Sequence, residues 1–279
     1  MHYLDEGRGD PVVMVHGNPT WSFFYRRLVL GLRGGFRCVV PDHIGCGLSD
    51  KGADFSYRLE DHVANLEQLV VDLDLRGVTL VVHDWGGAIG MGAALRQAER
   101  IKRLVIFNTA AFPAPHLPKR IACCRWPFVG PLAVRGGNLF ARAALRMAMG
   151  DPRKMTLNTA RGFLYPYNSW AHRVAIQKFV EDIPMEPEHP SYDLLKKIGE
   201  NLPALADRPV LLAWGMKDFC FTPWFLDRWR EIYPHAEVHR YEGAGHYLLE
   251  DEGDAILREV RSFLHRPRVV DAAETKAVG

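Results

Sequence analysis

The sequence predicts an α/β protein: a mostly parallel sheet with helices on both faces and a helical cap inserted between two of its strands. Two observations support this class. Short β-branched apolar runs alternate with single helical stretches up to residue 112, and strands joined by crossover helices lie parallel in one sheet. The alternation stops there and resumes near residue 208, so we interpret the stretch between as an insertion.

The same pattern divides the chain of 279 residues into four segments. We expect the first part of the core at residues 1–112, the cap at 113–207, the second part of the core at 208–266 and a polar, disordered tail at 267–279. The cap segment is mostly helical in pattern and is interrupted by prolines.

Continuous apolar runs mark the main strands, because a parallel strand that is covered on both faces is apolar at every position. The expected strands cover residues 3–5, 11–16, 36–40, 78–82, 104–107, 209–214 and 236–241. Core helices are expected at residues 21–32, 59–73, 88–99 and 255–264, with a further one starting near Pro223. In the second of these helices the apolar residues recur at helical spacing.

The composition fits a globular enzyme, with 48% hydrophobic and 24% charged residues. A formal net charge of +2 gives no reason to expect a nucleic-acid partner. No apolar run approaches the roughly 20 residues that a membrane-spanning helix needs, and the first residues lack the order of a signal peptide.

Five cysteines, an odd number without a repeating spacing, do not form a disulfide framework or a zinc site. We expect them to be reduced and mostly buried, which indicates a cytoplasmic protein. They are Cys38, Cys46, Cys123, Cys124 and Cys220. We expect no cofactor and no metal.

A strand, a sharp turn and a helix meet at residues 80–87, whose sequence is LVVHDWGG. This order is typical of a nucleophile elbow, which holds one side chain above the sheet on a tight turn. Asp84 lies at its centre, followed by Gly86, while Val82 fills the position where glycine is customary. A carboxylate can attack carbon and form an ester. The alternative is that His83 and Asp84 only cap the following helix.

Two further groups follow predicted strands, and should meet Asp84 at the carboxyl edge of the sheet, where open α/β sheets bind ligands. His246 comes after the last strand in a glycine-rich loop and is the expected base. Asp218 comes after the preceding strand and would orient the imidazole and stabilise its charged form. The alternatives are that His246 has only a structural role and that Asp218 is a turn residue that caps the helix starting near Pro223. The order nucleophile, acid, histidine is that of α/β-hydrolases.

The reaction also needs donors for the charge that develops or leaves. Backbone amides after Asp84 and in the loop at residues 16–19 would form an oxyanion-hole-type site. The Trp85 indole is a donor only, and the Asn18 amide donates as well, so this pair suits an anion that must later be released. The alternative for Trp85 is packing in the core.

Residues 16–21 (HGNPTW) together with residues 83–87 (HDWGG) resemble the haloalkane dehalogenases of the α/β-hydrolase fold, and the resemblance covers nearly the whole chain. It implies that Asp84 displaces halide, that Asn18 and Trp85 hold the halide, and that the histidine activates water on the alkyl-enzyme ester. One subgroup of that family carries its acid as glutamate after the strand that precedes the cap.

Asn108 occupies the position of that glutamate, so Asp218 must serve as the acid. Another branch of the family places its acid after the later strand, as Asp218 is placed here. Within that branch, four segments of this chain are similar to the bacterial β-lactone decarboxylases of long-chain olefin biosynthesis. They are residues 108–112, 134–140, 165–170 and 214–219. The resemblance implies conversion of a cis-3-alkyl-4-alkyloxetan-2-one, a cis-3,4-dialkyl-β-lactone, to a cis-alkene and carbon dioxide by the same triad. Relative to this family, we expect the chain to lack a first edge strand.

This resemblance also implies a small hydrophobic substrate with long chains and a complex with other olefin-biosynthesis enzymes. Asp84 would open the strained lactone by attack at carbon or at the carbonyl, and the sequence leaves both routes open. Decarboxylation needs no net water, whereas dehalogenation does.

Other functions stay open beside it. A haloalkane dehalogenase would use the same site. An epoxide hydrolase also uses an elbow aspartate, with cap tyrosines as acids; Tyr165 and Tyr167 keep this reading open, although Asn18 argues against it. A non-catalytic binding protein would need no triad. A serine esterase is excluded by Asp84 itself.

The cap is strongly basic. Between Pro113 and Ala175 it carries ten lysines and arginines against one acid, Asp151, with apolar residues such as Trp126 and Phe128 interleaved. One interpretation is an apolar underside with a solvated basic face. The other is docking to an anionic membrane surface or to an acidic partner.

Overall fold

One sheet forms the centre of the molecule. A computed structural model describes residues 1–266, and the tail expected at residues 267–279 lies outside the described residues. The strands are β1 (Tyr3–Glu6), β2 (Asp10–Val15), β3 (Phe36–Pro41), β4 (Val78–Asp84), β5 (Ile101–Thr109), β6 (Val210–Gly215) and β7 (Glu237–Tyr241). They pair in the order β1-β3-β2-β4-β5-β6-β7, and only the edge strand β1 is antiparallel to its neighbour. The predicted mostly parallel sheet is therefore confirmed.

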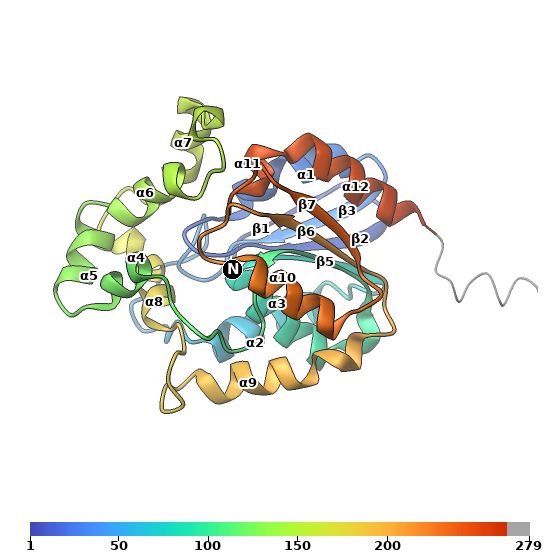
Figure 1. The fold of residues 1–279 in the computed structure, drawn as a ribbon, viewed down its shortest axis with the longest axis horizontal. Coiled ribbons are helices and arrows are strands. Elements are labelled where there is room, and N and C mark those ends of the chain that lie inside the picture. The colour runs from blue at the N-terminus through green and yellow to red at the C-terminus, as the bar shows by residue number, and fades with distance from the viewer. Residues whose placement is uncertain (267–279) are drawn as a thin grey trace, which may run out of the picture.

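Helices cover both faces of this sheet (Figure 1). One face carries α1 (Arg26–Leu32), α11 (Leu248–Asp251) and α12 (Gly253–His265). The other carries α2 (Leu59–Asp72), α3 (Trp85–Arg96), α9 (Tyr192–Asn201) and α10 (Pro223–Ile232). Among the described residues, no helix is both long and apolar enough to cross a bilayer.

Between β5 and β6 the chain forms further helices, which lie beside one end of the sheet in Figure 1. We call them the cap helices. They are α4 (Lys119–Ala122), α5 (Val129–Pro131), α6 (Leu139–Met147), α7 (Leu157–Leu164) and α8 (Val174–Glu181).

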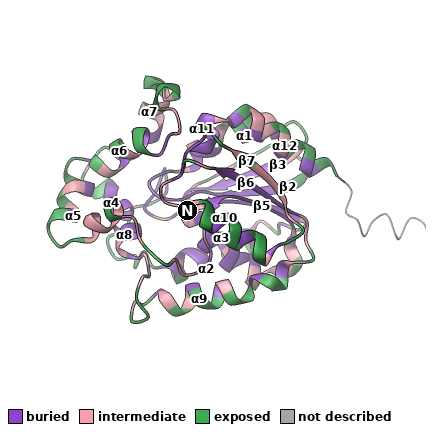
Figure 2. Ribbon diagram, viewed as in Figure 1, coloured by how far each residue is buried: buried purple, intermediate pink, exposed green. Residues whose placement is uncertain are grey.

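Successive residues of the central strands are buried on opposite faces of the sheet. In β4, Leu80 and Val82 belong to the same core cluster as residues of α2 and α3. Val81, between them, belongs to the cluster that contains residues of α1 and α12. Both faces are covered, which explains why the strands read as continuous apolar runs. Figure 2 shows the buried sheet and the many exposed residues of the cap helices.

The helix expected at residues 21–32 is divided. A 3-10 turn, Ser22–Tyr25, precedes α1. This turn buries Phe24 and Tyr25, and the Tyr25 hydroxyl donates to the Val15 carbonyl at 2.9 Å. The division of this helix therefore depends on contacts with the sheet, which cannot be predicted from the local sequence.

α9 falls inside the segment predicted as the cap, yet it packs on the core helices. A Cβ at Gly92 of α3 would lie 3.0 Å from Cδ1 of Ile198, and one at Gly199 would lie 2.8 Å from Cβ of Phe112. α9 therefore belongs to the layer that covers the sheet. The division of the chain at residues 113 and 207 stays a prediction.

The five cysteines are all free, but only Cys38 and Cys46 are buried. The expectation of mostly buried cysteines is wrong for Cys123, Cys124 and Cys220, which are partly exposed. The reason is that these three line the cavities beside Asp84, where part of each side chain faces open space.

Asp251, at the end of α11, ties the cap to the loop that carries His246. Its carboxylate accepts hydrogen bonds from the backbone N–H groups of Gly150 (2.7 Å), Asp151 (3.0 Å) and Gly245 (2.9 Å). Because Asp251 is buried, these N–H groups have little access to water as a substitute acceptor.

We expect Asp251→Ala to lower the free energy of unfolding by about 2–4 kcal/mol, since it removes a charged acceptor from three backbone N–H groups. Urea unfolding followed by circular dichroism would measure the loss. Asp54→Ala, at an exposed loop position, is the control and should stay within about 0.5 kcal/mol of the parent. A loss for Asp251→Ala no larger than that of the control would contradict the expectation.

Candidate active site

The sharp turn after β4 holds Asp84 at the carboxyl edge of the sheet. β4 ends at Asp84 and α3 begins at Trp85, earlier than the sequence indicates. The Asp84 backbone has φ +53° and ψ −128°, a conformation that residues other than glycine rarely adopt. Such strain persists only where the surroundings enforce it, and it is frequent at active sites. The strand, turn and helix of the expected elbow are all present.

Glycines let the elbow lie close to its neighbours. A Cβ at Gly86 would lie 2.1 Å from a carbonyl oxygen of β2, and one at Gly17 would lie 2.1 Å from Oδ1 of Asp84. Val82 stands where the motif usually has glycine. A Cβ at Gly90 would lie 2.6 Å from Cγ1 of Val82, so the glycine in α3 makes the room that this valine takes up.

Asp84, His246 and Asp218 come together in one group, in which His246 and Asp218 are buried. Nδ1 of His246 lies 2.7 Å from Oδ2 of Asp218, and Nε2 of His246 lies 3.6 Å from Oδ2 of Asp84. The other Asp218 oxygen accepts hydrogen bonds from the N–H groups of Cys220 (2.7 Å) and Phe221 (3.1 Å). The imidazole thus lies between two carboxylates, as it does in a nucleophile–histidine–acid triad.

The charges of this group stabilise one another. Burial lowers the pKa of the His246 imidazole, but the Asp218 and Asp84 carboxylates outweigh that effect, and the net pKa is raised. Burial raises the pKa of the Asp84 carboxyl. His246 and the backbone N–H groups of Asn18 and Trp85 lower it, but the net pKa stays raised. The two carboxylates therefore stabilise the imidazolium form of His246 relative to a histidine free in water.

Two backbone N–H groups hold the Asp84 carboxylate. The Asn18 N–H donates to Oδ1 of Asp84 at 2.6 Å, and the Trp85 N–H also hydrogen-bonds this carboxylate. The sequence predicts these amides as an oxyanion-hole-type site for the substrate. In the structure the carboxylate reaches into that site, because its second oxygen extends where a serine has none. The two amides therefore orient the nucleophile.

The Asn18 and Trp85 side chains both line the larger cavity beside Asp84. The Asn18 Nδ2 donates to the Ile176 carbonyl at 3.1 Å, which fixes the amide and leaves its second N–H for a ligand. The Trp85 indole packs on Phe179, with ring centroids 5.3 Å apart. No hydrogen bond joins its N–H to another residue of the described part of the chain.

Two buried side chains hold the loops of the site, a role that the sequence did not reveal. Nε2 of His83 lies 2.9 Å from the carbonyl oxygen of His246. A carbonyl only accepts, so Nε2 of the neutral ring carries the proton. The Asn108 side chain hydrogen-bonds both the N–H (2.8 Å) and the carbonyl (3.0 Å) of Gly215, joining the ends of β5 and β6. Their only sequence signal is a polar residue at the end of a buried strand.

The loop that carries Asn18 is held by buried histidines. Nδ1 of His16 lies 2.8 Å from the Gly17 carbonyl oxygen, and Nε2 of His16 accepts the His43 N–H at 3.1 Å. Burial lowers the pKa of His16 to about 4, so the ring is neutral near pH 7. This tautomer, with the proton on Nδ1, satisfies both contacts.

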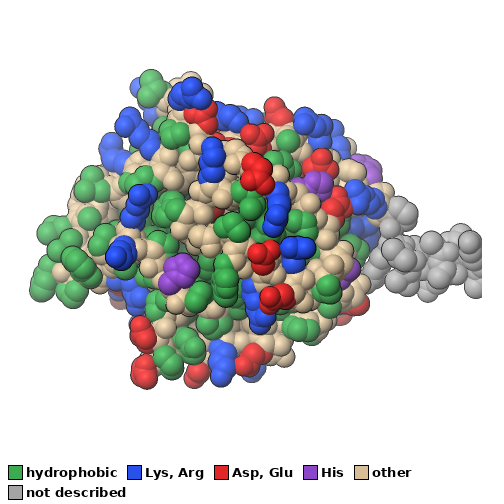
Figure 3. Space-filling model, viewed as in Figure 1, with side chains coloured by type: hydrophobic (Ala, Val, Ile, Leu, Met, Phe, Trp, Pro, Cys, Tyr) green, Lys and Arg blue, Asp and Glu red, His purple; other side chains and the backbone are tan. Residues whose placement is uncertain are grey.

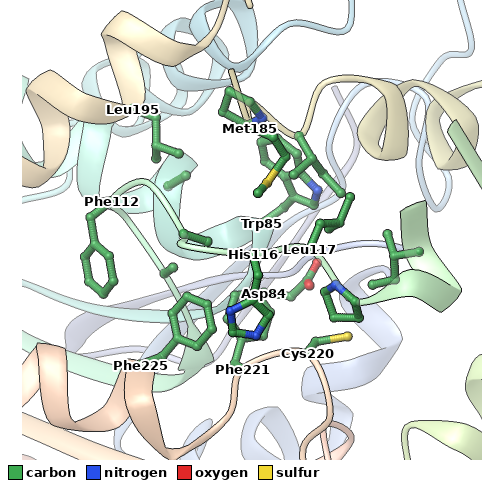
Figure 4. Close-up of a pocket in the computed structure, with 17 residues that line it drawn as sticks. Asp84, Trp85, Phe112, His116, Leu117, Met185, Leu195, Cys220, Phe221 and Phe225 are labelled. Carbon is green, nitrogen blue, oxygen red and sulfur yellow. The ribbon is translucent and has the colours of Figure 1, made fainter. Parts of the chain in front are cut away.

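Two cavities meet at Asp84, and both are lined mainly by apolar side chains. Figure 4 shows the smaller one, with Asp84 and Trp85 near its centre and Phe112, Leu195 and Phe225 toward one side. The larger one lies beneath the cap helix α6. Concave apolar spaces with a few polar groups at one point are typical of sites for hydrophobic small molecules.

The two tyrosines that would serve an epoxide hydrolase are not among the described residues that line these cavities. The Tyr167 hydroxyl donates to the Thr20 carbonyl at 3.0 Å and is buried. Tyr165 is exposed. Neither is placed to protonate a group beside Asp84.

One group of side chains within residues 1–266 brings potential metal ligands close together. It consists of Glu237, His239 and Glu259, on β7 and α12. None of them lines either cavity, and Glu237 forms an ion pair with Arg266. This group is separate from the site around Asp84.

The chain belongs to the α/β hydrolase fold family, whose profile matches residues 10–253. It is 46% identical to the cis-3-alkyl-4-alkyloxetan-2-one decarboxylase of Shewanella oneidensis, over 95% of this chain and 85% of the relative. Its identity to the Xanthomonas campestris decarboxylase of the same name is 43%, over 95% of this chain and 92% of the relative.

Haloalkane dehalogenases are also similar. Haloalkane dehalogenase 2 of Mycobacterium bovis is 32% identical over 92% of this chain and 88% of the relative. Among solved structures, the haloalkane dehalogenase DatA of Agrobacterium tumefaciens superposes with a TM-score of 0.84 at 27% identity, over 94% of this chain and 91% of that one.

We expect Asp218→Asn to lower the pKa of His246, because it removes the negative charge that stabilises the imidazolium. The asparagine oxygen can still accept from the Cys220 and Phe221 N–H groups, so the turn should persist. Proton NMR titration of the His246 ring would measure the shift. Asp193→Asn, at an exposed position, should leave that pKa unchanged. An unshifted pKa in Asp218→Asn would show that the carboxylate does not stabilise the charged ring.

Proposed function

We propose that this chain is a β-lactone decarboxylase that converts a cis-3-alkyl-4-alkyloxetan-2-one to a cis-alkene and carbon dioxide. The observation that carries the proposal is a carboxylate nucleophile, Asp84, whose side chain is only 13% exposed and lies at the junction of two apolar cavities. A ring with two alkyl chains fits such a junction. The two relatives with the higher identities are named for this substrate, whereas the similar dehalogenases are less identical.

The first step is attack on the ring. The free oxygen of Asp84, which is not held by the Asn18 N–H, attacks C4 of the lactone. The bond between C4 and the ring oxygen breaks, and its electron pair stays on that oxygen. The products are an ester between C4 and Asp84 and a carboxylate on C3. Asn18 and Trp85 are the donors placed to bind this carboxylate.

The second step releases carbon dioxide. The bond between C3 and the carboxylate breaks, and its electron pair becomes the π bond between C3 and C4. The bond between C4 and Asp84 breaks at the same time and returns its pair to Asp84. Attack from the back of C4 leaves the ester anti to the carboxylate, so anti elimination converts a cis lactone into a cis alkene without bond rotation.

Attack at carbon is favoured over attack at the carbonyl. Carbonyl attack creates a tetrahedral oxyanion, which needs preorganised backbone donors. The two suitable amides, those of Asn18 and Trp85, are already bound to Asp84. Attack at carbon instead creates a carboxylate at some distance from Asp84, within the larger cavity that the Asn18 and Trp85 side chains line.

His246 and Asp218 then act on the leaving group. A charged imidazole beside Asp84 stabilises the carboxylate that departs in the second step, and Asp218 holds the imidazole in that form. A base that activates water for ester hydrolysis must instead be neutral. Esterification removes the charge of Asp84, so in the intermediate only Asp218 still raises the pKa of His246.

A haloalkane dehalogenase is the second candidate, since it would use the same carboxylate and the same anion donors. A paired assay separates the two functions. Purified protein receives a cis-3,4-dialkyl-β-lactone or a 1-haloalkane, and alkene is measured by gas chromatography and halide by ion chromatography. We expect alkene from the lactone and no comparable release of halide.

The control for this assay is Asp84→Asn, which keeps the size of the side chain and removes its charge. We expect it to lose at least about 1,000-fold in rate, as nucleophile variants of triad enzymes do. Halide without alkene would replace the proposal with a dehalogenase. Substrate binding without either product, and without a covalent adduct in mass spectrometry, would indicate a binding protein.

We also propose a cytoplasmic location and work alongside the other olefin-biosynthesis enzymes that would form the lactone. Five free cysteines, three of them partly exposed, support the location, because oxidising compartments favour disulfides. The partner enzymes are proposed on the basis of the substrate, which has to be supplied.

We further propose that the cap docks on an anionic membrane surface. Trp126, Phe128, Val129 and Leu132, which we call the apolar tip, are exposed around α5, where Figure 3 shows hydrophobic side chains gathered. Phe128 is 85% exposed and has φ +65°, so its backbone is strained while its ring is hardly buried. An exposed apolar cluster of this kind marks an interaction surface.

The positive charge around the apolar tip indicates that the membrane surface it binds is anionic. The same helices and turns carry basic side chains: Lys119, Arg120, Arg125, Arg135, Arg142 and Arg146. Asp151, the one acid between residues 113 and 175, pairs with Arg153. Apolar side chains flanked by positive charge match an anionic bilayer. Leu139 and Met147 line the larger cavity and are also exposed, so a long-chain lactone could pass from lipid to Asp84.

Vesicle co-sedimentation tests this docking. We expect more protein on vesicles that contain anionic lipid than on neutral ones, with binding that falls as salt is raised. A double variant, Phe128→Ser with Leu132→Ser, should bind less, whereas Leu30→Ser, which changes an exposed leucine on α1, should bind like the parent. Equal binding to both kinds of vesicle, or none to either, would remove the proposal.

A further inference from the structure

The space around Asp84 has two arms. The smaller cavity has a volume of about 130 Å³ and the larger one about 360 Å³. Five residues line both of them and so mark the junction: Asp84, Trp85, Ile121, Ile183 and Cys220. The nucleophile is therefore reached from two separate apolar spaces.

The smaller arm is closed by core and loop residues. Phe112 follows β5, Leu195 is on α9 and Phe225 is on α10. Phe112 and Phe225 are buried and stack with centroids 6.2 Å apart, so this wall is part of the packed core. Ala88 and Ala114 leave the space between these larger side chains and Asp84.

The larger arm differs in its polar groups. Asn18 and His246 line it and do not line the smaller one. Its far wall comes from the cap helix α6, through Leu139, Ala144 and Met147. The end near Asp84 can thus bind an anion, while the rest is apolar.

We propose that the two alkyl chains of the lactone occupy different arms: the chain on C3 lies in the larger arm and the chain on C4 in the smaller one. This inference rests on the proposed function. Two cis chains on neighbouring ring carbons leave the ring side by side, and the junction offers each an apolar space of its own. The carboxyl carbon is attached to C3 and must face Asn18, which lines only the larger arm. C3 and its chain therefore lie on that side.

The arms differ almost threefold in volume, so the enzyme distinguishes the two substituents. A long chain on C4 meets the buried wall of Phe112 and Phe225. A long chain on C3 can extend under α6 toward the exposed Leu139 and Met147. The site therefore selects chain length separately at each ring carbon.

A matched pair of variants tests this assignment. Ala114→Phe fills the smaller arm and Ala144→Phe fills the larger one; each alanine lines one arm only and is partly exposed. The substrates are two cis lactones, one with octyl on C3 and methyl on C4, the other with these groups exchanged. The cis-3,4-dimethyl lactone reports whether Asp84 and the junction remain functional.

We expect Ala114→Phe to lower kcat/KM at least about tenfold for the lactone with octyl on C4 and to spare the other one. Ala144→Phe should do the opposite, each loss being measured relative to the rate of the same variant on the dimethyl lactone. Equal losses on both octyl lactones in both variants would refute separate arms. An exchanged pattern would overturn the assignment of C3 and C4.

The failure of this inference is distinct from that of the proposed function. If the unmodified protein makes no alkene from any of the three lactones, the proposed function is wrong. If it makes alkene and the two variants respond alike, only the two-arm assignment is wrong.

Discussion

The site depends on keeping a carboxylate ionised in an apolar space. A charge that leaves water is neutralised unless charged or hydrogen-bonding partners surround it. Asp84 has the Asn18 and Trp85 N–H groups on one side and the His246 imidazole on the other. Asp218, buried behind the imidazole, keeps a positive charge favourable there. The strained backbone of Asp84 is what carries its side chain to this point.

The same arrangement serves a nucleophile that must later leave. Hydrogen bonds to the carboxylate lower its reactivity slightly, but they also stabilise it each time it is released. A neighbouring imidazolium adds to that stabilisation. An enzyme that hydrolyses its ester needs a neutral base and a water molecule, whereas one that eliminates carbon dioxide needs neither. Two related reactions can therefore share one set of side chains.

The sequence predicted the parts of the site that follow a local rule. Asp84 was found because glycines and a helix follow a buried strand, and His246 and Asp218 because each comes after a later strand. The sequence did not show that the backbone amides near Asp84 are taken up by Asp84 itself. Nor did it show that Gly90 makes room for Val82, since that contact joins a helix to a strand across the elbow.

Other features were also hidden from the sequence for the same reason. α9 falls inside the segment predicted as the cap, but packing through Gly92 and Gly199 brings it against the core. In the sequence, His83 and Asn108 are polar residues at strand ends like many others. Their hydrogen bonds, from His83 to His246 and from Asn108 to Gly215, depend on how the loops are arranged.

The sequence by itself determined the class of fold, the order of the strands along the chain and the chemical types present at the sheet edge. These follow from periodicity and from turn chemistry, which are local. The tertiary structure alone decided which donors face Asp84, which carboxylates raise the pKa of His246, and the division of the cavity into two arms. These depend on distances between segments far apart in the chain, and such distances are set by packing.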